Sequence, residues 1–525
     1  MKQEEKLVNT DNQFELNFAP PQQKDNLENE EEKENYLYTK KNFKKLLFIS
    51  LIILILGFSA YLESKEYNIT SLLKTIKQYL GIKEHIDKLC YELDPFHIFE
   101  LRLNNPPVKI CENEITNQNH ICYLDTYKDY IFVKNGVTCT MKNIIVDPSK
   151  STQSNIIYKG PVDPYNRGFP ILTNGFLNMN CKNKKEFEGY YILYGTYFNS
   201  WNYNYNNEEE LQEIAPGKTI FFMNRNQDSP NIYHGSCELI NAVVMMKLLK
   251  LKPEDIQVIF LESMTINDDP FYDLYKEIIS RGGDPIHIRN ITKKFFVSSA
   301  VNIPINTDSP AFLDKHFLEC GEHEGKAYKL LNDLINKYMN IPTYEDRFIS
   351  DNEIYYYPKS VLDEREKEKE KIKYKKYITI QWRKVWPKGR TGQYRILGNG
   401  PQLAEKLANV LPKDFLVRLV DTAGLTIREQ ISLMKKTDYL VGMHGAGLSL
   451  SIFMSNKSIL HEVLPHMDMT VLTFMSSISG HKTYSDILRA TKKYIEGSEY
   501  FFFKEGHFVR KVLTHMKENN YFKKY

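Results

Sequence analysis

Short apolar runs alternate with amphipathic segments through the last 150 residues of the chain. The apolar runs predict buried strands at residues 376–383, 415–421, 438–445 and 458–465. The segments between them predict helices at residues 400–411, 426–436 and 446–454. Strands that alternate with helices form parallel βαβ units, so this pattern predicts a doubly wound, nucleotide-binding half.

A second stretch of alternating elements precedes it. Here we expect strands at residues 219–224, 255–263 and 284–291. Helices are expected at residues 238–249, 271–280 and 326–339. From residue 93 to about 215, short apolar runs mix with Gly, Pro and Asn and predict no clear elements. The fold class is therefore α/β, with two α/β halves.

One uncharged segment is apolar throughout. Residues 46–62 read LLFISLIILILGFSAYL and would form a helix about 25 Å long, enough to span a thin bilayer. A cleaved signal peptide is the alternative, but the 45 residues before the run are too many for its charged region. Four lysines directly before the run predict a cytoplasmic N-terminus, and hence a single-pass type II membrane protein.

These patterns divide the chain into seven parts. They are a cytoplasmic disordered tail (1–45), a transmembrane signal anchor (46–62), a stem (63–92), an N-terminal α/β domain (93–345), a charged linker (346–376), a C-terminal nucleotide-binding domain (377–500) and a C-terminal segment (501–525).

Charge and cysteines agree with a lumenal location. The 69 basic residues nearly balance the 66 acidic residues, so the chain lacks the basic field that nucleic-acid binding requires. Of seven cysteines, five fall between Cys90 and Cys181, which predicts disulfides, with buried thiols as the alternative. The odd count leaves at least one cysteine unpaired, and Cys237 or Cys320 is the candidate. Sequons for N-glycosylation occur at Asn68, Asn290 and Asn456.

The glycine-rich stretch at residues 438–453, DYLVGMHGAGLSLSIF, is the most informative motif. A buried strand runs into His444, Gly445, Ala446 and Gly447 and then into an expected helix, an arrangement that suits binding of a diphosphate. Glu462 follows at the end of the next strand, where a carboxylate can accept hydrogen bonds from a ribose. A purely structural tight turn is the alternative.

Other side chains could complete such a site. Arg383 and Arg395 lie upstream in the same half, and the planar guanidinium suits a leaving diphosphate, although either could form a surface salt bridge. In the first half, His234 and Glu238 are four residues apart and would share a helix face, as a general base and the residue that orients it. A helix cap or a buried core histidine is the alternative for His234.

The run LTIREQISLMKKTDYLVGMHGAGLSLSIF, with HEVLP after it and NIYHGSCELIN before it, resembles glycosyltransferase family 61 over residues 219–490. The family includes plant core beta-1,2-xylosyltransferase and the EGF-domain-specific O-linked N-acetylglucosaminyltransferase. The resemblance implies a GT-B-like fold of two Rossmann-like domains facing a cleft, and inverting chemistry on a UDP-sugar. Arg383, Arg395, His444, Gly445, Ala446, Gly447 and Glu462 would then bind the donor, and His234 and Glu238 would face the acceptor.

The resemblance also implies the cofactor, the substrates and the location. No Asp-x-Asp triplet occurs in the chain, so we expect no metal and no cofactor. The donor would be UDP-xylose or UDP-N-acetylglucosamine, the acceptor a glycan or glycoprotein, and the location the Golgi or endoplasmic reticulum membrane. The chain departs from the family pattern at Gly398-Asn399, where one extra residue puts the role of Asn399 in doubt. The rival hypothesis is a catalytically inactive, membrane-anchored protein that binds glycans or a partner.

Arg383 provides a test of the donor-site assignment. Replacing it with alanine should lower turnover at least roughly tenfold, because a positive charge opposite the leaving group would be lost. The measurement is a steady-state transfer assay of Arg383→Ala beside Arg395→Ala. An unchanged rate for either variant would remove that residue from the donor site.

Overall fold

The computed structural model describes most of the chain after residue 90. The described residues are 91, 94–113, 117–124, 137–153, 170–181, 183–184, 200–206, 210–223, 231–261, 270–303, 325–342, 355–359, 361, 376–382, 395–465, 473–495 and 498–522. The predicted tail and the expected membrane segment at residues 46–62 lie outside them. No helix within the described ranges is both long and apolar enough to cross a membrane. The described residues belong to one compact unit, Lys83–Tyr525.

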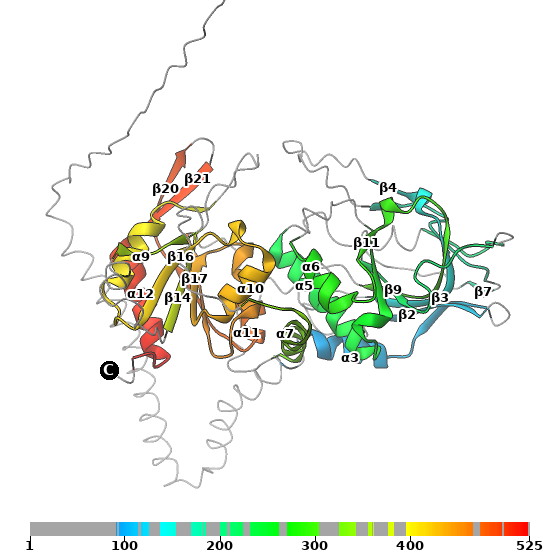
Figure 1. The fold of residues 1–525 in the computed structure, drawn as a ribbon, viewed down its shortest axis with the longest axis horizontal. Coiled ribbons are helices and arrows are strands. Elements are labelled where there is room, and N and C mark those ends of the chain that lie inside the picture. The colour runs from blue at the N-terminus through cyan, green and yellow to red at the C-terminus, as the bar shows by residue number, and fades with distance from the viewer. Residues whose placement is uncertain are drawn as a thin grey trace, which may run out of the picture. The chain divides into compact units, whose positions relative to one another are not determined.

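A six-stranded sheet organises the C-terminal half (Figure 1). Its strands are β13 (Tyr355–Tyr356), β14 (Lys376–Gln381), β16 (Phe415–Val420), β17 (Tyr439–Met443), β18 (Ile459–Leu464) and β19 (Lys482–Ile487). Their order is β13-β16-β14-β17-β18-β19, and all neighbours are parallel except β13 and β16. Numbered along the chain, the five parallel strands have the order 2-1-3-4-5, which is a doubly wound order.

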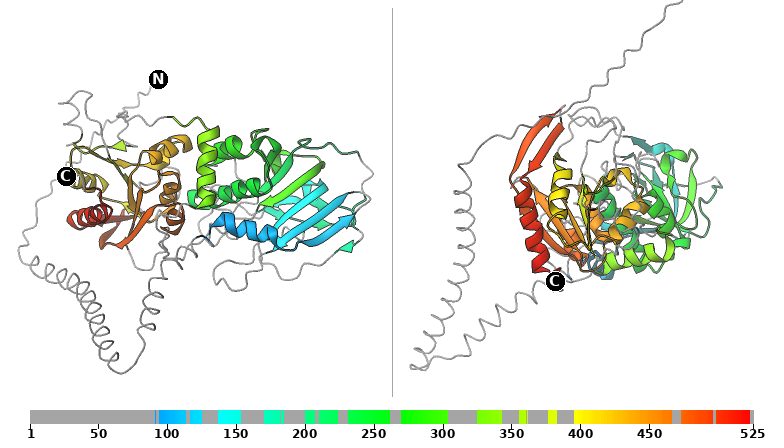
Figure 2. Two further views of the ribbon diagram at one scale, coloured as in Figure 1. Left: turned by 90° about the horizontal axis from the view of Figure 1, so that it is seen from below. Right: turned by 60° about the vertical axis from the view of Figure 1, so that its left-hand side comes forward.

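Helices cover both faces of this sheet, as the two views in Figure 2 show. One face packs on α9 (Gly400–Ala408) and α12 (Glu505–Glu518), and the other on α10 (Ile427–Lys435), the 3-10 helix η8 (Ala446–Phe453) and α11 (Thr473–Ile478). Because side chains alternate along a strand, Tyr439 and Val441 join the core with α9 and α12, whereas Leu440 joins the core with η8. A small sheet of β15 (Ile396–Leu397), β21 (Ser498–Phe503) and β20 (Ala490–Ile495) lies beside them.

The N-terminal half is built on a ten-stranded mixed sheet. Its parallel section has the order β11-β10-β9-β12, and its antiparallel section continues through β3, β2, β1 and β7. Strand β6 also pairs with β3, and β8 pairs with β6. The strands are β1 (Val108–Asn113), β2 (Gln118–Leu124), β3 (Val137–Val146), β6 (Leu177–Asn178), β7 (Asn183–Lys184), β8 (Trp201–Asn202), β9 (Thr219–Met223), β10 (Ile256–Phe260), β11 (Ile286–His287) and β12 (Phe295–Ile303). The predicted α/β class is confirmed, with a mixed sheet in this half.

The helices of this half are α3 (Pro95–Asn104), α5 (Ile232–Leu248), α6 (Tyr272–Leu274) with the π-helix η4 (Tyr275–Ile279), and α7 (Lys326–Tyr338). Short 3-10 segments, η1 (Pro148–Lys150), η2 (Pro253–Asp255), η5 (Ile288–Asn290) and η7 (Thr422–Gly424), and a small sheet of β4 (Ser151–Gln153) and β5 (Pro170–Leu172), complete the described elements.

The two halves share an apolar core. Residues of α3, α5 and α7 belong to the same buried cluster as residues of α10 and η8. Polar contacts fix the same interface: Asn332 Nδ2 donates to the carbonyl oxygen of Ile452 at 3.0 Å, and Ser432 Oγ to that of Pro342 at 2.6 Å. The first half of the chain therefore packs directly on the helix that follows the glycine turn.

Four expected elements differ from the structure. Residues 446–453 form a 3-10 helix and not an α-helix. The strand expected at residues 284–291 is only Ile286–His287, followed by a 3-10 turn. The helix expected from Glu238 begins at Ile232, because the Asn231 side chain accepts a hydrogen bond from Tyr233 N and caps it there. Tyr355–Tyr356, within the range assigned to the linker, pair with β16 as β13.

Two disulfides join strands of the N-terminal half, as predicted for the early cysteines. Cys111 pairs with Cys181, and Cys122 on β2 pairs with Cys139 on β3. Cys237 lies buried in α5 and belongs to neither disulfide, and Cys90 and Cys320 lie outside the described residues.

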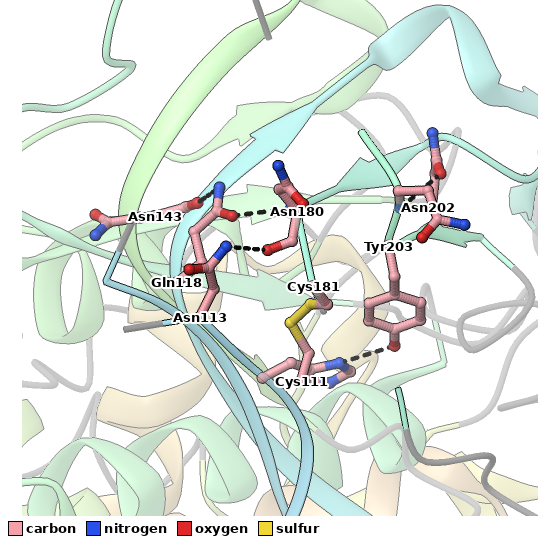
Figure 3. The surroundings of a disulfide bond; sticks show 10 residues. Cys111, Asn113, Gln118, Asn143, Asn180, Cys181, Asn202 and Tyr203 are labelled. Atoms are coloured by element: carbon pink, nitrogen blue, oxygen red, sulfur yellow. Dashed lines mark hydrogen bonds between the residues drawn. A yellow bond between two sulfur atoms is a disulfide. The ribbon is translucent and has the colours of Figure 1, made fainter. Parts of the chain in front are cut away.

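Amide side chains surround the Cys111–Cys181 bond (Figure 3). Asn113 Nδ2 donates to the carbonyl oxygen of Asn180 at 2.8 Å, and Asn180 N donates to Gln118 Oε1 at 2.8 Å. Gln118 Nε2 donates in turn to the carbonyl oxygen of Asn143 at 2.9 Å. The disulfide and these bonds hold the segment around Asn180 against β1 and β2.

The two disulfides should stabilise the fold unequally. They close loops of different length, with sequence separations of 70 and 17 residues. Loop-closure entropy predicts that replacing Cys111 and Cys181 by alanine costs about 4 kcal/mol, and replacing Cys122 and Cys139 about 3 kcal/mol. Urea denaturation of both double variants without reductant measures this order. A larger loss for the shorter loop would contradict the entropic explanation.

Candidate active site

The candidate site lies where the strand order of the C-terminal sheet reverses. Of the five parallel strands, β14 comes first along the chain. Its neighbours β16 and β17 lie on opposite sides of it, so the chain continues toward one edge of the sheet and then toward the other. In doubly wound sheets, ligands bind beside the carboxyl ends of the strands at this switch point. The carboxyl ends of β14 and β17 meet here, since Gln381 pairs with Gly442. His444 follows β17, and Arg383 follows β14 but lies outside the described residues.

The Gln381 side chain fills the space beside the glycine turn. A Cβ atom on Gly447 would overlap the Gln381 amide nitrogen, and one on Gly442 would lie 3.0 Å from Gln381 Cβ. Gln381 Nε2 also donates to Thr422 Oγ1 at 3.2 Å. Gly447 thus makes room for a buried amide that joins β14 to the turn. Its assignment to donor binding, like those of Gly445 and Ala446, stays a prediction.

His444 and Glu462 form a buried pair at this edge of the sheet. Nδ1 of His444 lies 2.5 Å from Glu462 Oε1, and the side chains are 8% and 0% exposed. The second carboxylate oxygen of Glu462 accepts a hydrogen bond from Ser485 Oγ at 3.2 Å. Because Nδ1 faces the carboxylate, a ligand would meet the His444 imidazole at Nε2. Sequence reasoning assigned both residues to the donor side, and the structure brings them together.

Arg395 belongs to the same electrostatic environment. Burial lowers the pKa of Arg395, while the carboxylates of Glu462 and Glu499 act to raise it. Its backbone has a φ of 72°, in the left-handed region that non-glycine residues rarely adopt. Such strain costs on the order of 1–3 kcal/mol and is concentrated at functional sites. Arg395 is therefore held in place near the His444–Glu462 pair.

Asn399, four residues later, has a structural role. Its amide donates to the carbonyl oxygen of Phe503 at 2.8 Å, and its Oδ1 accepts from Phe503 N at 3.1 Å. Both hydrogen bonds join the start of α9 to β21. Asn399, which is shifted by one residue relative to the family pattern, therefore binds the backbone of β21.

His234 and Glu238 lie one turn apart on α5, as the spacing predicts. Glu238 is completely buried, whereas His234 is partly exposed, with its ring 5.5 Å from that of Tyr233. Helix α5 packs on η8, directly after the glycine turn. Helix α5, which carries His234, therefore contacts the segment that follows His444.

Two of the three sequons lie among the described residues. Asn290 and Asn456 are both exposed and so accessible to modification. Asn68 lies outside the described residues. N-glycosylation at all three stays a prediction.

Most of this site lies in a part of the chain that matches a known protein family. Residues 301–461 match the family model of Glycosyltransferase 61. The match confirms the resemblance found in the sequence. It contains the glycine turn, His444 and both candidate arginines, and it ends one residue before Glu462. No curated protein matches the chain significantly.

Sequence reasoning missed two residues of this candidate site. Gln381 is the last residue of β14, two positions before Arg383. Its place at the carboxyl end of a predicted strand could have marked it as a candidate site residue. Ser485 lies on β19, whose sequence KTYSDI has few apolar residues and no alternation strong enough to predict a strand. Its contact with Glu462 could be found only from the pairing of β18 with β19.

The fit between Gln381 and Gly447 can be tested by a double-mutant cycle. Gly447→Ala should destabilise the protein by about 1–3 kcal/mol, because the added methyl group overlaps the amide. Combining it with Gln381→Ala should recover part of that loss. Thermal unfolding of the single and double variants measures the coupling. Gly506→Ala is the matched control, since a Cβ there meets nothing within 4 Å; additive losses would disprove the contact.

Proposed function

We propose that the protein is an inverting, metal-independent glycosyltransferase that moves xylose or N-acetylglucosamine from a UDP-sugar to a glycan or glycoprotein. The observation that carries the proposal is the buried His444–Glu462 pair at the switch point of a doubly wound sheet, within the region that matches the family. A UDP-sugar needs cationic or hydrogen-bonding groups at its diphosphate, and this edge provides them. The metal-independent reading is supported by the arginines and by the lack of an Asp-x-Asp triplet.

The leaving diphosphate would be stabilised from the C-terminal half. With Nδ1 facing Glu462, His444 would offer Nε2–H to the phosphate oxygen that gains charge as the bond to the sugar breaks. Arg395 and Arg383 would supply the remaining positive charge. Ser485 would keep Glu462 oriented. Each group acts on charge that develops in the transition state, so each would raise turnover more than it raises ground-state affinity.

The acceptor would be activated from the N-terminal half. A general base must touch the acceptor hydroxyl, and the complete burial of Glu238 favours His234 for this contact. Glu238, one turn along α5, would then orient the imidazole. Attack on the face of the sugar opposite the nucleotide inverts the anomeric configuration in a single displacement.

We further propose the cellular setting that the sequence implies. A GT-B-like arrangement would place donor and acceptor in a cleft between the two halves, with the catalytic domain in the lumen of the Golgi or endoplasmic reticulum. The uncharged segment at residues 46–62 would anchor it as a type II protein. Disulfides in the N-terminal half support an oxidising compartment.

A donor screen tests the proposal. The full-length chain in detergent is incubated with UDP-xylose, UDP-N-acetylglucosamine and other UDP-sugars, without added divalent cations, and thermal protection and sugar hydrolysis are measured. One UDP-sugar should protect the protein and be turned over. His444→Ala should lower that turnover roughly a hundredfold, the effect of losing one hydrogen-bond donor to the developing charge.

Further variants separate the two half-sites. His234→Ala should retain thermal protection by the donor but lose transfer to an acceptor, because it would remove only the base. His507→Ala, on α12, should behave as the unchanged chain. A chain that is folded but shows no response to any UDP-sugar would disprove the proposal and favour an inactive binding protein.

A further inference from the structure

Three side chains of metal-binding type meet on the face of the C-terminal sheet that packs on α12. They are His461 on β18, Asp486 on β19 and His515 on α12, and their ligand atoms all lie within 4.8 Å of one another. Asp486 Oδ2 is 3.1 Å from His461 Nε2 and 2.6 Å from His515 Nε2. His461 is completely buried and His515 is 9% exposed. Two imidazole nitrogens and one carboxylate oxygen therefore converge on one buried spot.

Each of these side chains has an outer partner that holds it. The hydroxyl of Tyr439 lies 3.0 Å from His461 Nδ1, and Lys511 Nζ lies 3.1 Å from Asp486 Oδ1. On the other side, Glu518 Oε2 is 3.7 Å from His515 Nδ1, and the Tyr484 ring stacks on the His515 ring at 3.7 Å. At His461, Tyr439 binds the second ring nitrogen in the way that is characteristic of metal-ligating histidines, which leaves Nε2 to face an ion. At His515, the stacked Tyr484 ring holds the imidazole.

Two ring nitrogens of the cluster, His461 Nε2 and His515 Nδ1, lack a hydrogen bond, and the first of them faces the other ligands. His461 Nε2 is buried and forms none, although Asp486 Oδ2 lies 3.1 Å away. The two atoms are near each other without the geometry of donor and acceptor. This is expected where both face a common third atom. A buried ring nitrogen that makes no hydrogen bond is costly, and a bond to a metal ion would satisfy it.

We propose that His461, Asp486 and His515 bind a divalent transition-metal ion, Zn²⁺. Imidazole nitrogens and a carboxylate oxygen are ligands that zinc takes at about 2.0–2.2 Å, which places ligand atoms roughly 3.3 Å apart, so the three side chains need to move by only about 1–1.5 Å. A water molecule would complete a tetrahedral set. The second cluster of metal-binding residue types among the described residues, His120 with Cys122 and Cys139, has its sulfur atoms in a disulfide.

The ion would have a structural role and no part in transfer. His461 and Glu462 are neighbours on β18, so their side chains lie on opposite faces of the sheet, and only Glu462 joins His444. An ion held by His461 would connect β18, β19 and α12. It would fix the C-terminal helix to the sheet, while the diphosphate would still be met by arginine and histidine on the other face.

Metal content and a spectrum test the proposal. The full-length chain, made without a polyhistidine tag, is treated with a chelator, dialysed against Zn²⁺ and then against buffer, and analysed by mass spectrometry. About one Zn²⁺ per chain should remain. The same chain loaded with Co²⁺ should show the visible absorption of a tetrahedral nitrogen and oxygen site, which needs no variant and so does not depend on folding of one.

Variants locate the ion. His515→Gln and Asp486→Asn should lower the retained Zn²⁺ at least tenfold, and His507→Gln, on the same helix, should keep it. Retention below a tenth of one Zn²⁺ per unaltered chain would overturn the proposal, and so would equal retention by all three variants. Neither readout involves UDP-sugar turnover, so the result is independent of the transferase assay.

Discussion

The alternation of side chains along β18 is the constraint on which the C-terminal half depends. His461 and Glu462 are consecutive, both are completely buried, and they face opposite sides of one sheet. Burying an ionisable side chain is costly unless other groups pair with it, so polar partners are needed on both faces of the sheet. On one face these are His444 and Ser485, and on the other Tyr439 and Asp486. One strand thereby fixes both the glycine turn and the C-terminal helix.

The same constraint explains why the polar strand β19 stays at the edge of the sheet. Ser485 and Asp486 are also consecutive, so their side chains lie on opposite faces of the sheet. Ser485 donates to Glu462 on one face, and Asp486 pairs with His461 on the other. The parallel register pairs Glu462 with Ser485, so a shift by one residue would exchange both sets of partners. The polar residues of β19 thus specify its register, a task that apolar residues perform in β17.

Much of the C-terminal half could be predicted from the sequence, and the reason is physical. Strands such as β16 and β17 are buried on both faces, so their apolar runs are continuous and easily recognised. The glycine turn, His444 and Glu462 were found because they follow such strands. The contact of Gln381 with Gly447 was out of reach, since it joins residues 66 positions apart and depends on the strand order. Ser485 and Asp486 were hidden by the polar character of their strand.

The N-terminal half was less predictable because its antiparallel strands lack the continuous apolar runs of β16 and β17. The register of β2 with β3 is fixed by the Cys122–Cys139 bond and by amide side chains such as Gln118, and not by an alternating pattern. Helix α5 was recognised, but its start required the Asn231 cap. Its burial has a consequence for chemistry. The apolar residues of α5 pack closely on η8, the helix that follows the glycine turn. The position of His234, the proposed base, therefore depends on the same turn that positions His444.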